Sequence, residues 1–112
     1  MKKIFTYIFI YLICLSANAQ NNLPVKIYGR VDCGEWLSPP SQVQRIANEY
    51  WLLGYLTGVN AMLMTPAMNI GNVLGWLNSP KQAFAWMDKY CRENPLSTTD
   101  LGGLTLMNEL KK

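Results

Sequence analysis

Residues 50–63 read Tyr-Trp-Leu-Leu-Gly-Tyr-Leu-Thr-Gly-Val-Asn-Ala-Met-Leu, a stretch that is apolar on nearly every side and is interrupted by one threonine and one asparagine. This pattern predicts a buried central helix. Gly54 and Gly58 lie four residues apart, so they share one helical face and leave a flat strip where another backbone can approach closely. The same spacing marks helix pairs in membranes, but this apolar run is too short for a bilayer, which requires roughly 20 residues. The stretch therefore indicates the core of a small helical domain.

The surrounding sequence extends this helix from about Ser41 to Met64. A stripe of apolar and small residues with a 3.6-residue period is expected to face the core. Asn60 falls within the apolar part, where a buried amide requires hydrogen-bond partners. Two roles are open for it, and we favour anchoring of a neighbouring loop over contact with a ligand. The stripe consists of Val43, Ile46, Ala47, Tyr50, Leu53, Gly54, Thr57, Gly58 and Ala61.

The amino terminus has the pattern of a secretory signal peptide. Two lysines precede an apolar block over residues 4–15, and Ala17 and Ala19 occupy the two positions that signal peptidase reads. We predict a signal peptide over residues 1–19 that is cleaved after Ala19, followed by a flexible leader over 20–31 and a single helical domain over 32–112. Cleavage and export imply a periplasmic protein.

Removal of the signal peptide changes both the charge and the cysteine content. The chain has ten basic and seven acidic residues, and loss of Lys2 and Lys3 leaves eight and seven. A nearly neutral protein is not expected to bind nucleic acid or an anionic membrane. Cys14 leaves with the signal, so Cys33 and Cys91 are expected to form a structural disulfide in an oxidising compartment. A redox-active pair is less favoured because no C-x-x-C motif is present.

Capping and breaking signals predict three further helices. Asp32 is followed three positions later by Glu35, which predicts a capping box for a short helix that ends at the prolines 39–40. Residues 79–82 (Ser-Pro-Lys-Gln) open a helix that ends at the Asn-Pro pair 94–95. The buried stripe of this helix is expected to contain Ala83, Phe84, Met87, Tyr90 and Cys91.

A cap pattern over residues 97–100 opens the last helix. Gly102 and Gly103 are expected to weaken it by roughly 1 kcal/mol each relative to alanine. Its apolar residues are Leu101, Leu104, Leu106, Met107 and Leu110. The fold class that follows is all-α, a small disulfide-stapled bundle of about four helices.

The segment 65–78 contains one proline, two glycines and three asparagines among large apolar residues. Either it folds back as a short helix that completes the core, or it forms a partly exposed adhesive surface. We favour the first reading. Trp51 and Trp86 are explained by packing within helices. The candidate contacts for another protein are therefore Trp36, Met68, Ile70, Leu74 and Trp76.

The sequence contains no pattern typical of catalysis. Histidine is absent, and no phosphate-binding loop, nucleophile elbow, paired carboxylates or metal-ligand spacing is found. We therefore expect no catalytic residue, no metal site, no bound cofactor and no enzyme activity. A small hydrolase or a ligand-binding protein is the alternative.

Two families share features with this chain. The run 32–37 (Asp-Cys-Gly-Glu-Trp-Leu) precedes a long apolar helix, and a second cysteine closes a later helix at Tyr90-Cys91. In these features the chain resembles small exported helical proteins of the HdeA type. The pattern 51–58 followed by 90–95 also resembles the Rap1a/Tai type immunity proteins of type VI secretion, which protect the periplasm from toxic effectors. The resemblance extends from about residue 32 to residue 110.

The resemblance implies a helical periplasmic protein that binds another protein. As an immunity-type inhibitor, it would present a preformed surface with aromatic anchors to a secreted effector or hydrolase. As an acid-stress chaperone, it would loosen when its carboxylates are protonated and would expose apolar surface to unfolded clients. A second copy of the chain is a further partner to consider.

Overall fold

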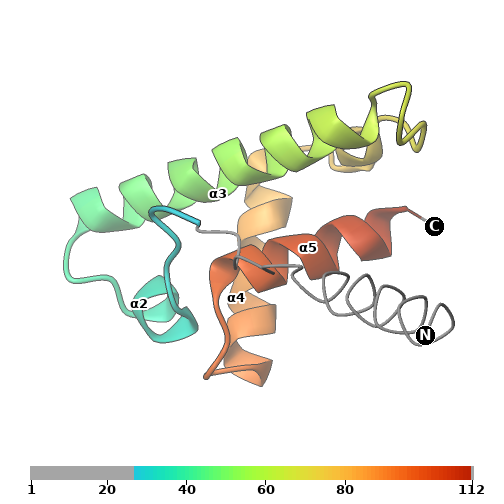
Figure 1. Cartoon of the computed structure of the whole chain (residues 1–112). Helices are drawn as coiled ribbons and strands as arrows, with labels where there is room; N and C mark the ends of the chain where they lie inside the picture. Colours follow the sequence, from blue (N-terminus) through green and yellow to red (C-terminus); the bar gives the residue numbers. More distant parts are fainter. Residues whose placement is uncertain (1–26, 112) are drawn as a thin grey trace, which may run out of the picture.

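The computed structural model describes residues 27–111, so the predicted signal peptide and most of the predicted leader lie outside the described residues. The described chain is all-α, as the sequence predicts, and Figure 1 shows its arrangement. No residue from 27 to 111 belongs to a strand. None of the helices described is long and apolar enough to cross a membrane. The elements are α2 (Cys33–Leu37), α3 (Gln42–Leu63), the 3-10 helix η1 (Val73–Trp76), α4 (Pro80–Glu93) and α5 (Thr99–Leu110).

The capping signals explain where the helices begin. The Asp32 carboxylate accepts a hydrogen bond from the Glu35 amide at 2.8 Å, and the Ser41 hydroxyl accepts one from the Gln44 amide at 3.1 Å. These bonds satisfy amides that have no partner within the first turn. The predicted starts of α2 and α3 are therefore confirmed. The cap of α5 is Thr98, one residue later than the sequence pattern indicated.

α4 begins at Pro80, as predicted, but its cap differs in detail. The Ser79 side chain makes no capping hydrogen bond. Instead, the Gln82 side-chain oxygen accepts a hydrogen bond from the Asn78 amide at 2.6 Å. The glutamine that the sequence places at the third helical position therefore closes the turn before the helix.

The predicted disulfide is present, and it lies in the centre of the core. Cys33 of α2 is bonded to Cys91 of α4, and both residues are completely buried. The bond joins two segments that are 58 positions apart in sequence. The remaining core is contributed by every helix and by residues just outside them: Val31, Trp36, Leu52, Leu56, Leu63, Val73, Ala83, Met87, Leu106 and Met107.

The buried face of α3 is not the face that the periodicity predicted. α3 packs against α5 and η1 through a row of larger side chains, Asn48, Leu52, Leu56 and Leu63. The predicted stripe lies on the opposite side, where Tyr50 and Gly54 are exposed. Both faces of α3 are apolar, so the period alone does not select one. In the second half of α3, burial of Leu56 and Leu63 removes more apolar surface from water than burial of Gly58 and Ala61 would.

The apolar residues of α5 do not all face the core. Leu106 and Met107 are buried, whereas Leu101 and Leu104 are exposed, and the adjacent Gly102 and Gly103 are buried. A Cβ added at Gly102 would lie only 2.7 Å from the Met87 sulfur. The glycine therefore allows α4 and α5 to approach more closely than any other residue would permit.

Gly103 allows α5 to approach α3 closely in the same way. A Cβ at this position would lie 3.0 Å from the ring of Tyr55, which is tighter than ordinary van der Waals contact. The two adjacent glycines thus contact α4 on one side and α3 on the other. The helix weakness expected from Gly102 and Gly103 is offset by this packing.

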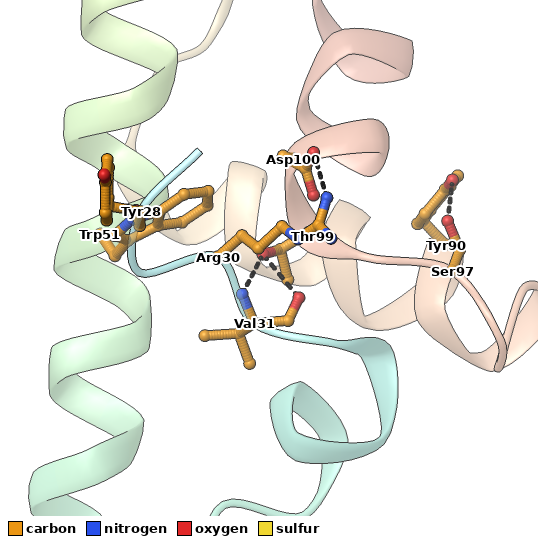
Figure 2. A network of polar contacts seen from close by, with 8 residues as sticks. All are labelled: Tyr28, Arg30, Val31, Trp51, Tyr90, Ser97, Thr99 and Asp100. Carbon is orange, nitrogen blue, oxygen red and sulfur yellow. Dashed lines mark hydrogen bonds and ion pairs between the residues drawn. The ribbon is translucent and has the colours of Figure 1, made fainter. Parts of the chain in front are cut away.

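The described end of the leader is fixed to the domain. The Val31 amide donates a hydrogen bond to the Thr99 hydroxyl, and the Val31 carbonyl accepts from both the hydroxyl and the amide of Thr99 (Figure 2). The Cys33 amide donates to the Ser97 carbonyl at 3.0 Å. Residues 27–31 were expected to belong to a flexible leader, but these bonds and the burial of Val31 anchor them to the start of α5.

Two further contacts hold the same segment. The Trp51 indole N–H donates to the Tyr28 carbonyl at 2.8 Å, and the Arg30 guanidinium lies 3.9 Å from the buried Asp100 carboxylate (Figure 2). Trp51 also stacks on Tyr55, one turn further along α3. The segment before α2 therefore bridges α3 and α5.

Removal of the disulfide is expected to destabilise the domain strongly. In the double variant Cys33→Ala/Cys91→Ala, the loop-closure entropy of the unfolded chain returns, which corresponds to roughly 4 kcal/mol for a loop of this length. Guanidinium unfolding followed by circular dichroism measures the change. A small domain has little stability in reserve, so we expect partial or complete unfolding at 37 °C. Unfolding midpoints that match those of the parent protein would contradict this assignment.

Gly102→Ala is expected to destabilise the domain although alanine favours helix. The gain of about 1 kcal/mol in helix propensity is outweighed by overpacking against Met87, which typically costs 1–3 kcal/mol. Thermal unfolding measures the net loss. Thr105→Ala is the matched control, because Thr105 is an exposed residue of the same helix. A Gly102→Ala protein that is more stable than the parent would show that the close contact between α4 and α5 is not required.

Candidate functional site

The ionisable groups of the described chain show no arrangement typical of a metal centre. Within residues 27–111, no group of three or more His, Cys, Asp or Glu side chains is placed to hold an ion. Burial raises the pKa of Tyr55, and the negative charge of Asp100 raises it further. The Tyr55 ring packs against Gly103 in its neutral form.

The strongest candidate is a set of exposed apolar side chains at the end of α3, in the loop that follows it and at the end of η1. Figure 1 shows that this part of the backbone lies at one end of the described chain. We call this set the apical surface. Trp76 is 70 % exposed, and the other members are each more than two-fifths exposed. Exposed methionines are frequent on surfaces that bind other proteins, because their side chains adapt to varied shapes. The apical surface consists of Met62, Met64, Met68, Ile70 and Trp76.

The loop beneath this surface has a defined conformation. Asn69 and Gly71 have φ angles of 49° and 107°, in the left-handed region that asparagine and glycine tolerate best. The amides of Ile70 and Gly71 both donate hydrogen bonds to the carbonyl of Leu63, near the end of α3. The chain therefore reverses direction immediately after the helix.

Asn60 fixes the second half of the loop, as the sequence analysis proposed. Its side-chain oxygen accepts a hydrogen bond from the Leu74 amide at 2.9 Å, and its side-chain nitrogen donates to the Asn72 side chain at 3.0 Å. Asn72 in turn accepts from the Gly75 amide and caps η1. These bonds hold η1 against α3 and so determine where Trp76 projects.

Segment 65–78 combines the two alternatives that the sequence left open. Its second half folds back as η1 and contributes Val73 to the core, while Leu74 and Leu77 are half-buried beside it. Its first half, together with Trp76, is exposed. One segment therefore completes the core and presents apolar surface at the same time.

The predicted contact residues divide into three groups. Met68, Ile70 and Trp76 lie on the apical surface, and Leu74 lies half-buried beneath it. Trp36, in contrast to the expectation of an exposed contact, is only 2 % exposed.

Trp36 is a core residue because α2 packs directly on α4. Its indole N–H donates to the Asp88 carboxylate at 2.8 Å, and its ring centroid lies 6.3 Å from that of Phe84. Met62 and Met64 are exposed but were not predicted as surface residues. Their position at the end of α3, away from the leucine row, is the feature that indicates their exposure.

Charge is absent from this part of the chain. No charged residue occurs between Glu49 and Lys81. A hollow of about 220 Å³ is lined by Met62 of the apical surface, by Leu104 and Met107 of α5, and by the charged Lys111 after α5. The five residues of the apical surface are themselves uncharged, so they can be buried against a partner without desolvation of an ion of their own.

Comparison of the chain with protein-family models, with curated proteins and with solved structures gives no match. The functional argument therefore rests on the chain's own residues.

Asn60→Ala is expected to loosen the apical loop while leaving the helices in place. The part-buried Leu74 amide and the exposed Asn72 side chain would lose their partners, at a cost of about 0.5–1.5 kcal/mol for each hydrogen bond. Hydrogen exchange measured by mass spectrometry should show faster exchange over residues 65–77. Asn108→Ala is the control, because Asn108 is an exposed amide on α5. Unchanged exchange over the loop would contradict the anchoring role.

Proposed function

We propose that this protein is an exported, non-enzymatic binding protein of the immunity type, which inserts its apical surface into an apolar recess of a secreted effector or hydrolase. The observation that carries the proposal is the exposed indole of Trp76 on a turn that is held by side-chain hydrogen bonds. Large aromatic anchors of this kind contribute most of the binding energy in many protein interfaces.

The geometry favours a folded partner with a concave site. Asn60 and Asn72 hold the turn before any partner arrives, so little conformational entropy is lost on binding. Trp76 supplies a rigid group, and the exposed methionines of the apical surface have side chains that adapt to the walls of a recess. An exposed and prearranged Trp76 side chain is complementary in shape to a cleft on the partner.

The charge pattern also restricts the partner. Because the chain from residue 50 to residue 80 is uncharged, the attraction comes from burial of apolar surface and from the rim of asparagine and threonine side chains. The recess on the partner is therefore apolar and uncharged. Binding of this type depends little on ionic strength.

Export is part of the same proposal. The signal-peptide pattern over residues 1–19 and the buried disulfide between Cys33 and Cys91 support export to an oxidising compartment. An inhibitor of this class would meet its effector in the periplasm. The resemblance to immunity proteins points to the same partner class.

Trp76→Ala is expected to weaken partner binding at least tenfold, which corresponds to a loss of about 1.4 kcal/mol or more. The tagged protein is used to isolate one stoichiometric partner from the exported fraction. Calorimetry with that purified partner then measures the dissociation constants of the parent protein and the variant, at about 0.05 and 0.5 M salt. We expect little difference between the two salt concentrations.

Leu96→Ala is the matched control, because Leu96 is completely exposed but lies far from the apical loop in sequence, between α4 and α5. It should bind the partner as the parent protein does. Equal affinity of Trp76→Ala and the parent protein would contradict the proposed surface. Capture of many unrelated unfolded proteins in place of one folded partner would contradict the inhibitor proposal and favour a chaperone.

A further inference from the structure

The outer face of α3, directed away from α5 and η1, is exposed and uncharged. Val43 is 78 % exposed and Tyr50 is 71 % exposed. Surface helices usually carry charged and polar groups on the side that faces water. The two large residues, Val43 and Tyr50, lie in the first half of this face, and only small residues lie in the second half. In order, the face presents Val43, Ala47, Tyr50, Gly54, Gly58 and Ala61.

The glycines of this face have no packing role within the described chain. A Cβ added at Gly54 or at Gly58 would meet no heavy atom within 4 Å. Glycine destabilises a helix interior relative to alanine, and neither position has a positive φ angle. Gly102 and Gly103, by comparison, are required by contacts inside the domain. The space at Gly54 and Gly58 is therefore not filled by any of the residues 27–111.

We propose that the outer face of α3 is the interface of a two-fold symmetric homodimer, in which the α3 helices of two copies pack antiparallel. With the symmetry axis level with the turn between Tyr50 and Gly54, each Tyr50 ring lies over Gly54 of the other copy. In the same register, Val43 lies over Ala61. Each bulky residue of one copy therefore meets a small residue of the other, and every contact occurs twice.

This self-complementarity favours a second copy as the occupant. A parallel pairing would place Tyr50 against Tyr50 and Gly54 against Gly54, which leaves a clash at one level and a void at the next. The antiparallel pairing removes both. It also forms a closed, isologous contact, which is the commonest symmetry of soluble oligomers, and it buries no charge of the face.

The size of the face is sufficient for a reversible dimer. α3 has 22 residues, so it is about 33 Å long. A hollow of about 500 Å³ borders one edge, where Ile46, Leu53 and Phe84 add apolar surface and Glu49 and Lys81 form a charged rim. A helix pair of this length lies at the lower end of specific interfaces, and we expect a dissociation constant in the micromolar range.

The proposed dimer does not depend on the proposed binding function. It uses the outer face of α3, whereas the apical surface lies at the end of that helix and in the loop after it. The two are tested by different measurements, since dimerisation is observed with the protein alone.

Sedimentation equilibrium of the purified protein, expressed from its complete coding sequence, tests the interface. The parent protein should show a concentration-dependent dimer. Tyr50→Arg and Gly54→Ala should each weaken it at least tenfold, while circular dichroism shows that both remain folded. Gly54→Ala should also raise the melting temperature of the monomer, because alanine favours helix. Leu96→Arg, the matched control on an exposed leucine outside α3, should dimerise as the parent does.

A charge-pair experiment tests the orientation. Val43→Lys and Ala61→Glu should each weaken the dimer, and the double variant should recover it, because lysine and glutamate face each other only in the antiparallel register. A parent protein that remains monomeric at all concentrations would overturn the proposal. Dimerisation that is unaffected by Tyr50→Arg, or is not recovered in the double variant, would overturn it equally.

Discussion

The bond between Cys33 and Cys91 is the constraint on which the rest of the fold depends. α2 has only five residues, far fewer than an isolated helix requires. The bond fixes this short helix on α4, and Trp36 then fills the core beside it. With α2 in place, the segment before it reaches Thr99 at the start of α5. One covalent bond thus holds α2 on α4 and, through α2, the preceding segment against the start of α5.

α3 supports both proposed contact regions because it is apolar on two opposite faces. Its leucine row packs on α5 and η1, and its outer face remains in water. Its last turn carries Asn60, which holds the loop and places Trp76. A single long helix therefore links the core to the apical surface and to the proposed dimer interface. This explains why a chain of this size contains so long a stretch without charge.

The position of the candidate surface was partly predictable. Met68, Ile70 and Trp76 were selected because they lie in an apolar loop, and they are exposed. Trp36 was selected for a different reason, because Trp51 and Trp86 were assigned to packing within helices, and it is buried. A tryptophan in a five-residue helix has no periodicity to indicate its environment. Only the packing of α2 on α4 decides where its ring lies.

The sequence by itself determined the helical class, the helix ends and the cysteine pairing, because caps, prolines and thiols act over a few residues or through a unique bond. It favoured an anchoring role for Asn60, since a polar amide among apolar residues requires partners, and the hydrogen bonds to Asn72 and Leu74 decided that role. Only the tertiary structure decided which face of α3 is buried. That choice depends on the shapes of α5 and η1. Gly102 and Gly103 show the same dependence, because they are needed for the close approach of α4 and α3, which the sequence around them does not indicate.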